Sequence, residues 1–237
     1  MIHPCFAMLP PPKDFRGLLL IVAGPTGTGK TTVSERLVGS HPEIERIVTC
    51  TTRRPRARER HGVDYFFLSN AEFDAALAKD EFLEWAQVHA WRYGTKKSTV
   101  LDRLEHNADL VVNVDVRGAQ AYRKAFADNP VVRGRLVTVF IMPPDLQTIR
   151  ARLVERGQDL PEQIERRLKT ALYEIEQWAD FDYCVVTGSK EQDYARVEGI
   201  WMAEKCRVTR LCASLLAESA PDSAEDDAHT RSPFPGP

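Results

Sequence analysis

The sequence predicts an α/β fold with a doubly wound parallel sheet, and two observations lead to that prediction. Apolar runs recur along the chain, at residues 18–22, 110–116, 135–142 and 182–187. A run that is apolar on both faces is what a strand buried in a parallel sheet requires. Helical patterns follow these runs, at 30–38, 118–127, 145–156, 161–179 and 190–216. Strand followed by helix, repeated along the chain, favours helices on both faces of one sheet.

Composition limits the classes of function. The chain has 237 residues, which suits one sizeable domain, and its 32 basic and 34 acidic residues nearly cancel. The small net charge gives no strong positive potential of the kind that attracts nucleic acids or membranes. Any recognition of phosphate must therefore come from a few basic side chains at one site. The five cysteines form no CxxC pair and favour a reducing, cytoplasmic setting. We expect no signal peptide and no membrane span, because the start lacks a basic region and no long apolar run occurs.

The two ends differ from the rest of the chain. Residues 1–16 are rich in proline and 217–237 are acidic and rich in proline, a composition typical of disordered extensions. Between them, the segment 47–100 breaks the alternation of strand and helix. It contains an arginine-rich loop, a short strand near residue 66, a helix from residue 70 and an aromatic segment that ends in Tyr-Gly-Thr. We predict that it is an inserted substrate-binding subdomain.

The first apolar run ends in a glycine-rich turn that opens a helix. This turn matches the pattern GxxxxGK[ST] at Gly24, Pro25, Thr26, Gly27, Thr28, Gly29, Lys30 and Thr31. Its glycines let the backbone wrap around phosphate oxygens, and the helix N-terminus attracts anions. Lys30 can reach the β and γ phosphates, and the Thr31 hydroxyl can coordinate Mg²⁺. We predict ATP or GTP binding with Mg²⁺ at residues 24–32, including Thr32; a GTPase, a motor and a kinase all remain open.

A second phosphate site is indicated in the arginine-rich loop. Arg53 and Arg56 are three residues apart and can converge on one phosphate, since a guanidinium matches phosphate oxygens with two parallel hydrogen bonds. Tyr65 and Tyr93 can add hydroxyl donors without adding charge. Taken alone, a basic run of this kind is also typical of a solvated loop or a nucleic-acid patch.

The segment that contains this loop resembles the signature of the guanylate kinase family, in which T-[ST]-R-x-x-[KR] precedes an acid, a glycine and a tyrosine. Those positions are filled here by residues 51–56, Glu59, Gly62 and Tyr65, and the resemblance covers about residues 17–208. It implies transfer of the γ-phosphoryl group of ATP to GMP, with Arg53, Arg56, Tyr65 and Tyr93 on the GMP phosphate. It also implies a domain at 17–210, with a core (17–46, 101–143 and 171–210), a GMP-binding subdomain (47–100) and a helical lid (144–170). Arg58 stands where the family often has glycine.

Guanine presents two adjacent donors, N1–H and N2–H₂, beside the acceptor O6, so one carboxylate can accept both donors and a hydroxyl can donate to O6. The resemblance implies that Glu84 is this carboxylate and that Thr26 and Thr95 are hydroxyls near the base. It further implies that Asp115 contacts guanine or a water bound to Mg²⁺. Asn113 replaces the first acid of the family's acid-x-acid pattern. Which of Asn113 and Asp115 contacts the metal and which contacts the base is therefore open.

Arg152, Arg156 and Arg167 match the spacing of the family's lid arginines. The resemblance implies that they act with Lys30 in catalysis, since electrostatic stabilisation of the transferring group carries most of phosphoryl transfer. An amphipathic helix with surface ion pairs is the alternative. Thr187 stands where the family has an asparagine that contacts adenine, so we expect the adenine contacts to be weaker or to be made by other groups.

Two other functions remain open at this stage. One is a guanylate-kinase-like module that has lost catalysis and binds a protein segment; such a module is expected to lack a complete phosphate loop, whereas Gly29, Lys30 and Thr31 are intact. The other is a related kinase with a different acceptor, such as a ribose bisphosphate. Glu84 and Thr95 speak against it, because a sugar phosphate has no guanine edge to read.

Overall fold

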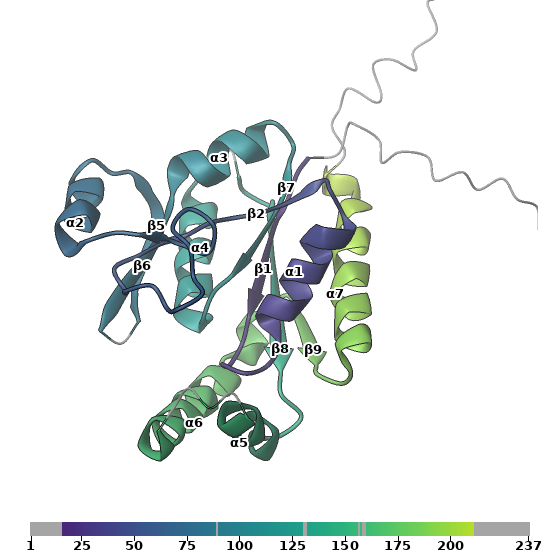
Figure 1. Cartoon of the computed structure of the whole chain (residues 1–237). Coiled ribbons are helices and arrows are strands. Elements are labelled where there is room, and N and C mark those ends of the chain that lie inside the picture. The colour runs from purple at the N-terminus through teal and green to yellow at the C-terminus, as the bar shows by residue number, and fades with distance from the viewer. Residues whose placement is uncertain (1–15, 89, 130–131, 156, 158–159, 211–237) are drawn as a thin grey trace, which may run out of the picture.

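The computed structural model describes residues 16–88, 90–129, 132–155, 157 and 160–210. Its central sheet has five parallel strands in the order β2-β7-β1-β8-β9 (Figure 1). The strands are β1 (Leu19–Ala23), β2 (Ile44–Arg46), β7 (Asp109–Asn113), β8 (Leu136–Met142) and β9 (Tyr183–Val186). The predicted α/β fold with a parallel sheet is confirmed. The edge strand β2 was not predicted, because only Ile44 of its three residues is buried and so no apolar run marks it.

Helices cover both faces of this sheet, and successive residues of β1 point to opposite faces. Leu20 and Val22 pack in one cluster with α1 (Lys30–Ser40) and α7 (Lys190–Lys205). Leu19 and Ile21 pack in another with α3 (Lys97–Glu105) and α4 (Val116–Asp128). All five residues of β1 are at most 1% exposed. This two-sided burial explains why the run is continuously apolar rather than alternating.

A second sheet of four short strands has the order β4-β3-β6-β5 and lies at the left of Figure 1. Its elements are β3 (Cys50–Thr51), β4 (Phe66–Phe67), β5 (Phe82–Val88) and β6 (Trp91–Lys96), with α2 (Asn70–Ala78) packed on it. The rings of Phe73 and Phe82 stack with centroids 4.4 Å apart. A Cβ on Gly94 would lie 2.9 Å from the Phe82 ring, so this close approach requires glycine.

A pair of helices, α5 (Leu146–Glu155) and α6 (Pro161–Glu176), lies at the bottom of Figure 1 and has its own apolar cluster around Ile149, Leu153 and Leu168. The helix expected at 161–179 ends at Glu176, and a one-turn 3-10 helix follows at Trp178–Asp180. The boundaries given for the subdomain and the lid stay predictions. Within the described ranges, no helix is long and apolar enough to cross a membrane.

The helix expected over 190–216 is wrong in length, since α7 ends at Lys205 and a 3-10 turn follows at Val208–Arg210. The Arg210 guanidinium turns back to pair with Glu204 at 2.8 Å and donates to the Gly134 carbonyl at 2.9 Å. Both charged side chains are at most 4% exposed, so this buried pair holds the chain off the helical path. Residues 211–216 lie outside the described residues, as do residues 1–15 and 217–237 of the two predicted extensions.

Candidate active site

The glycine-rich loop joins β1 to α1. Gly24, Gly27 and Gly29 have φ angles of 134°, 83° and 95°, values that residues with side chains rarely adopt. Gly24 also packs on β8, where a Cβ would lie 2.5 Å from the Ile141 carbonyl oxygen. Gly29 precedes the first residue of α1, so the unpaired N–H groups of the first helical turn lie next to the loop. Backbone N–H groups of this kind suit an anion, so phosphate binding at the loop stays the prediction.

Lys30 folds over this loop. Its Nζ donates to the carbonyl oxygens of Gly24 and Pro25, at 2.5 and 2.8 Å. The buried Thr28 hydroxyl also donates to Pro25, at 2.8 Å, so Thr28 shapes the loop rather than presenting its hydroxyl outward. Thr31 and Thr32 are exposed on the first turn of α1.

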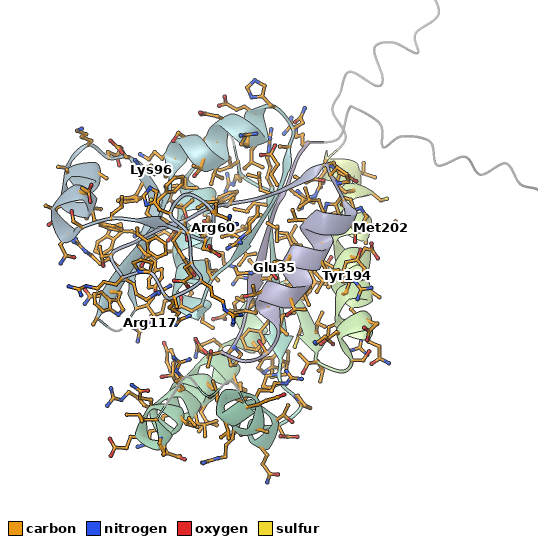
Figure 2. The ribbon with its side chains drawn as sticks, in the orientation of Figure 1. Glu35, Arg60, Lys96, Arg117, Tyr194 and Met202 are labelled. Atoms are coloured by element: carbon orange, nitrogen blue, oxygen red, sulfur yellow. The ribbon has the colours of Figure 1, made fainter. Side chains whose placement is uncertain are left out.

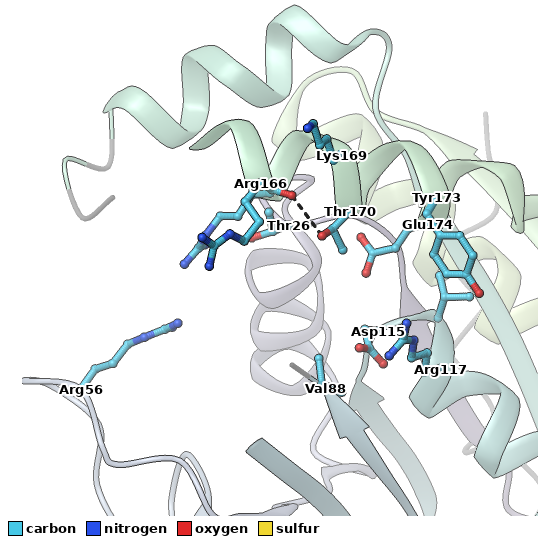
Figure 3. A pocket seen from close by; sticks show the side chains of 12 residues that line it. Thr26, Arg56, Val88, Asp115, Arg117, Arg166, Lys169, Thr170, Tyr173 and Glu174 are labelled. Carbon is cyan, nitrogen blue, oxygen red and sulfur yellow. Dashed lines mark hydrogen bonds between the residues drawn. The ribbon is translucent and has the colours of Figure 1, made fainter. Parts of the chain in front are cut away.

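Two adjoining cavities connect the loop to the second sheet and to α6. A cavity of about 300 Å³ is lined by loop residues Thr26, Lys30 and Thr31, by Tyr65, Glu84 and Tyr93, and by Asn113 and Asp115. A larger cavity of about 590 Å³ shares Thr26, Val88, Asp115 and Glu174 with it and is also lined by Arg56, Arg117, Arg166 and Arg167. In Figure 3, Arg56 extends from its loop toward the helix that carries Arg166. The structure thus brings together residues from segments that are far apart in the sequence.

Glu59 organises the arginine-rich loop. The Arg53 guanidinium donates to Glu59 Oε1 at 2.8 Å and to the Arg54 carbonyl at 2.8 Å, and lies 5.4 Å from the centre of the Tyr65 ring. The backbone N–H of Arg56 donates to Glu59 Oε2 at 2.8 Å, while the Arg56 side chain is 61% exposed. Glu59 therefore holds together the segment that carries both arginines. The acid of the family signature has a physical role here that the sequence alone did not reveal.

Glu84 and Thr95 face each other across β5 and β6. The Thr95 hydroxyl donates to Glu84 Oε1 at 2.7 Å, and the Tyr122 hydroxyl lies 2.5 Å from Thr95 Oγ1. Burial raises the pKa of Glu84 to about 7; the Thr95 hydrogen bond opposes this shift, and the Asp115 charge adds to it. Such a shift in a cavity-lining carboxyl is typical of functional sites.

The carboxyl end of β7 supplies Asn113 and Asp115. Asp115 caps α4 by accepting the Gly118 N–H at 2.8 Å, and it lines both cavities. Asn113 Oδ1 accepts from the buried Ser34 hydroxyl at 2.5 Å. Because Oδ1 is engaged by Ser34, Asn113 presents mainly its amide N–H₂ group to the cavity.

Two of the three predicted lid arginines lie at this site. Arg152 donates to the Gly27 carbonyl at 3.0 Å, which links α5 to the phosphate loop. Arg167 lines the larger cavity with Arg56. Arg156 lies outside the described residues, and the catalytic roles of all three arginines stay predictions.

Glu174 was missed by the sequence analysis. It lies on α6, lines both cavities, and has a pKa raised to about 7 by burial, with the Lys30 charge opposing and the Asp115 charge adding to the shift. Its spacing of seven residues from Arg167 places both side chains on one face of α6, a signal that could have revealed it.

Thr187 follows the last strand of the central sheet. Its backbone N–H donates to the Met142 carbonyl at 2.8 Å, and its side chain is 7% exposed. Among the described residues, its buried hydroxyl has no hydrogen-bond partner. The hydroxyl itself is buried, and Thr187 lines neither of the two cavities.

Comparisons with known proteins agree with this geometry. The family model described as guanylate kinase matches residues 16–204. A guanylate kinase of Clostridium perfringens is 37% identical over 217 residues, which cover 92% of this chain and 95% of that protein. One of Streptomyces kasugaensis is 42% identical over 182 residues, covering 77% and 85%. The crystal structure of guanylate kinase from Anaplasma phagocytophilum has a TM-score of 0.70 at 27% identity and covers 88% of this chain and 97% of that one. This chain belongs to the guanylate kinase family.

Proposed function

We propose how the residues of this chain carry out its activity as a guanylate kinase, the ATP-dependent phosphorylation of GMP to GDP. One observation carries the proposal: a single cavity is lined both by the phosphate loop and by Tyr65, Glu84 and Tyr93 of the second sheet. In-line transfer between two bound phosphates requires a donor site and an acceptor site that open into one space. We therefore assign ATP to the loop and GMP to the second sheet.

On the donor side, we assign the ATP phosphates to the backbone donors of residues 24–31 and to Lys30. Lys30 now donates to two loop carbonyls and exchanges these bonds for the β and γ phosphate oxygens when ATP binds. Arg152 at Gly27 and Arg167 across from Arg56 flank the transferring group, where positive charge stabilises the transition state.

On the acceptor side, we assign the GMP phosphate to Arg53, Arg56, Tyr65 and Tyr93. The attacking oxygen belongs to a phosphate that is already anionic, so the reaction needs no general base. Glu84 reads the guanine edge, because an ionised carboxylate accepts from both N1–H and N2–H₂. Thr26 and Asp115, which line the same cavity, are the further polar groups proposed near the base.

Mg²⁺ fits the donor set of this site. The Thr31 hydroxyl and the Asp115 carboxylate line one cavity, and no group of three potential metal-binding His, Cys, Asp or Glu side chains occurs among the described residues. This suits Mg²⁺ held chiefly by nucleotide phosphates and water, with Thr31 as the protein ligand. When bound, the ion would neutralise developing phosphate charge. We also propose a cytoplasmic location, which the free thiols of Cys50, Cys184 and Cys206 support.

The release of ADP by the purified full-length chain tests the activity. ATP and Mg²⁺ are supplied with GMP, AMP, UMP, CMP or no acceptor, and strong dependence on GMP is expected. If GMP binds but no acceptor supports ADP release, the chain is an inactive binding module instead. If another acceptor supports faster release than GMP, the guanine assignment of Glu84 is wrong.

GMP affinity is expected to fall as the pH drops below about 7. Burial raises the pKa of Glu84 to about 7, so the carboxyl becomes protonated and neutral below that pH and can no longer accept both guanine donors. Each pH unit below the pKa is expected to weaken binding up to about tenfold. Calorimetric titration of GMP across this pH range measures the effect.

Glu174→Gln is the control for this pH profile, since the pKa of Glu174 is also raised to about 7. Guanosine, which lacks the titrating phosphate, is the matched ligand. The assignment to Glu84 is contradicted if guanosine binding stays flat with pH, or if Glu174→Gln abolishes the pH dependence.

Asn113→Asp is expected to lower the Mg²⁺ concentration needed for half-maximal ATP binding, by roughly 3- to 10-fold. An aspartate could still accept from Ser34 while adding negative charge at the end of β7, where the amide now presents a donor. Titration of ATP by calorimetry at a series of Mg²⁺ concentrations measures the change. An unchanged Mg²⁺ dependence would show that Asn113 does not face the ion.

A further inference from the structure

Three polar side chains form a line from the hydrophobic core to the smaller cavity. Tyr122, on α4, is 0% exposed and belongs to the apolar cluster between the central sheet, α3 and α4. Its hydroxyl lies 2.5 Å from Thr95 Oγ1 on β6, and the Thr95 hydroxyl donates to Glu84 Oε1 on β5 at 2.7 Å. Glu84 is the member of the line that reaches the cavity. The Tyr122 hydroxyl, which lies in the apolar core, is therefore connected to Glu84 through Thr95.

The direction of hydrogen-bond donation along this line follows from its chemistry. An ionised carboxylate can only accept, so Thr95 uses its single hydrogen on Glu84. The short contact between Tyr122 and Thr95 is then a donation by Tyr122. Burial raises the pKa of Tyr122 well above its usual value, so this phenol keeps the hydrogen that it donates. Donation therefore runs from Tyr122 through Thr95 to Glu84.

This direction changes the role that the family resemblance implies for Thr95. While Glu84 is ionised, Thr95 has no hydrogen left to donate to guanine O6. Thr95 is itself 0% exposed, which also separates it from a ligand. One oxygen of Glu84 is engaged by Thr95, and the remaining acceptor sites of the carboxylate are available to the two guanine donors.

We propose that Tyr122 is a positioning residue for guanine recognition, which acts through Thr95 to orient the Glu84 carboxylate. The inference rests on the proposed role of Glu84 in GMP binding. Glu84 has a hydrogen-bonding neighbour, Thr95 on β6. The titratable groups that interact with it are Asp115 at the start of α4, Cys50 on β3 and Tyr122 itself. The Asp115 charge disfavours an ionised Glu84, whereas the donated hydrogen bond favours it. Tyr122 therefore supports both the orientation and the charge that guanine requires.

Tyr122→Phe, made in the full-length chain, removes the hydroxyl and keeps the ring. We expect the Kd for GMP to rise about 5- to 10-fold near neutral pH, because Thr95 loses the donor that commits its hydrogen to Glu84. The KM for ATP and the kcat at saturating GMP stay within about twofold. The pH at which GMP binding is half lost moves upward, a change that a purely structural role would not produce. Calorimetric GMP titrations over the pH range measure both effects.

Tyr194→Phe is the matched control. Tyr194 is also buried and its hydroxyl also donates to a carboxylate, that of Glu198, but it lies on α7 in the cluster on the other face of the central sheet. Figure 2 shows it at the right, beside α7, whereas Lys96 of β6 lies at the left. This variant is expected to keep the GMP affinity and the pH profile of the unmodified chain.

Equal GMP affinity and an equal pH profile in Tyr122→Phe and the unmodified chain would overturn the inference. Should Tyr122→Phe fail to fold, 3-fluorotyrosine introduced at position 122 provides a second test, since fluorine makes the phenol a stronger donor at nearly the same volume. Half-loss of GMP binding is then expected at lower pH, and an unmoved profile overturns the inference equally. If the unmodified chain neither binds GMP nor releases ADP with it, the proposed function itself fails, and this is seen before any variant is made.

Discussion

Lys30→Ala is expected to reduce kcat for GMP phosphorylation by at least about 10³-fold, because it removes the flexible cation that follows the γ-phosphoryl group during transfer. The unmodified side chain lies over the loop, within 2.8 Å of the carbonyls of Gly24 and Pro25. The backbone donors of the loop remain in the variant, so ATP binding should weaken far less than turnover. Steady-state ADP release and calorimetric ATP binding separate the two effects.

Lys97→Ala is the matched control for this prediction. Lys97 is also the first residue of a helix, α3, but it pairs with the exposed Asp80 on the surface. Such a pair contributes at most about 1 kcal/mol to stability, so activity should stay close to that of the unmodified chain. Near-normal turnover of Lys30→Ala would contradict the assignment of the phosphate loop.

Glu84→Gln is expected to lower kcat/KM for GMP by about 10² to 10⁴-fold and to erode the preference for GMP over AMP. The amide places an N–H₂ group where guanine presents its own donors, so one buried donor on each side loses its partner. Turnover measured with GMP and AMP in parallel gives the ratio directly. An unchanged ratio would show that another group reads the base.

The same substitution is expected to stabilise the fold at alkaline pH. Because burial raises the pKa of Glu84 from 4.5 to about 7, the folded chain holds a proton that the unfolded chain releases between these values. Stability therefore falls as the pH rises through this window, and the cost is complete above pH 7. A neutral glutamine avoids it, so Tm should rise by about 2–6 °C at alkaline pH. The gain should vanish at acidic pH, which thermal unfolding at two pH values will show.

Lost activity combined with raised Tm distinguishes recognition from misfolding. A variant that merely disturbed β5 would lose both activity and stability. The combination expected here means that the folded chain tolerates an unfavourable charge at Glu84 because guanine requires it.

The parts of this protein that could be predicted from the sequence are those set by local chemistry. Burial on both faces forces the β1 run to be apolar, and Gly24 and Gly29 need backbone angles that other residues rarely adopt. These constraints act over a few neighbouring residues, so they leave a pattern in the sequence. The same holds for the family signature, which was confirmed by the family match.

The parts that could not be predicted depend on contacts between distant segments. Ser34 and Asn113 are 79 residues apart, and Thr95 and Tyr122 are 27 apart, and neither pair leaves a local pattern. The chain after α7 was misplaced for the same reason, because Arg210 contacts Gly134, which is 76 residues away in the sequence. The sequence patterns identified Lys30, Glu84 and Asp115, which line the cavities, but they identified neither Glu174 nor the contacts that hold these side chains in place.

The contact of Glu59 with the arginine-rich loop has a consequence for how the acceptor arrives. Two guanidinium groups held close together repel each other, and Glu59 offsets part of that repulsion while also bonding the Arg56 backbone. Arg53, Arg56 and Glu59 together carry one net positive charge rather than two, and the Glu59 carboxylate holds the two arginine positions through hydrogen bonds within the chain. GMP meets a preorganised surface, so its binding energy is not spent on folding the loop around it.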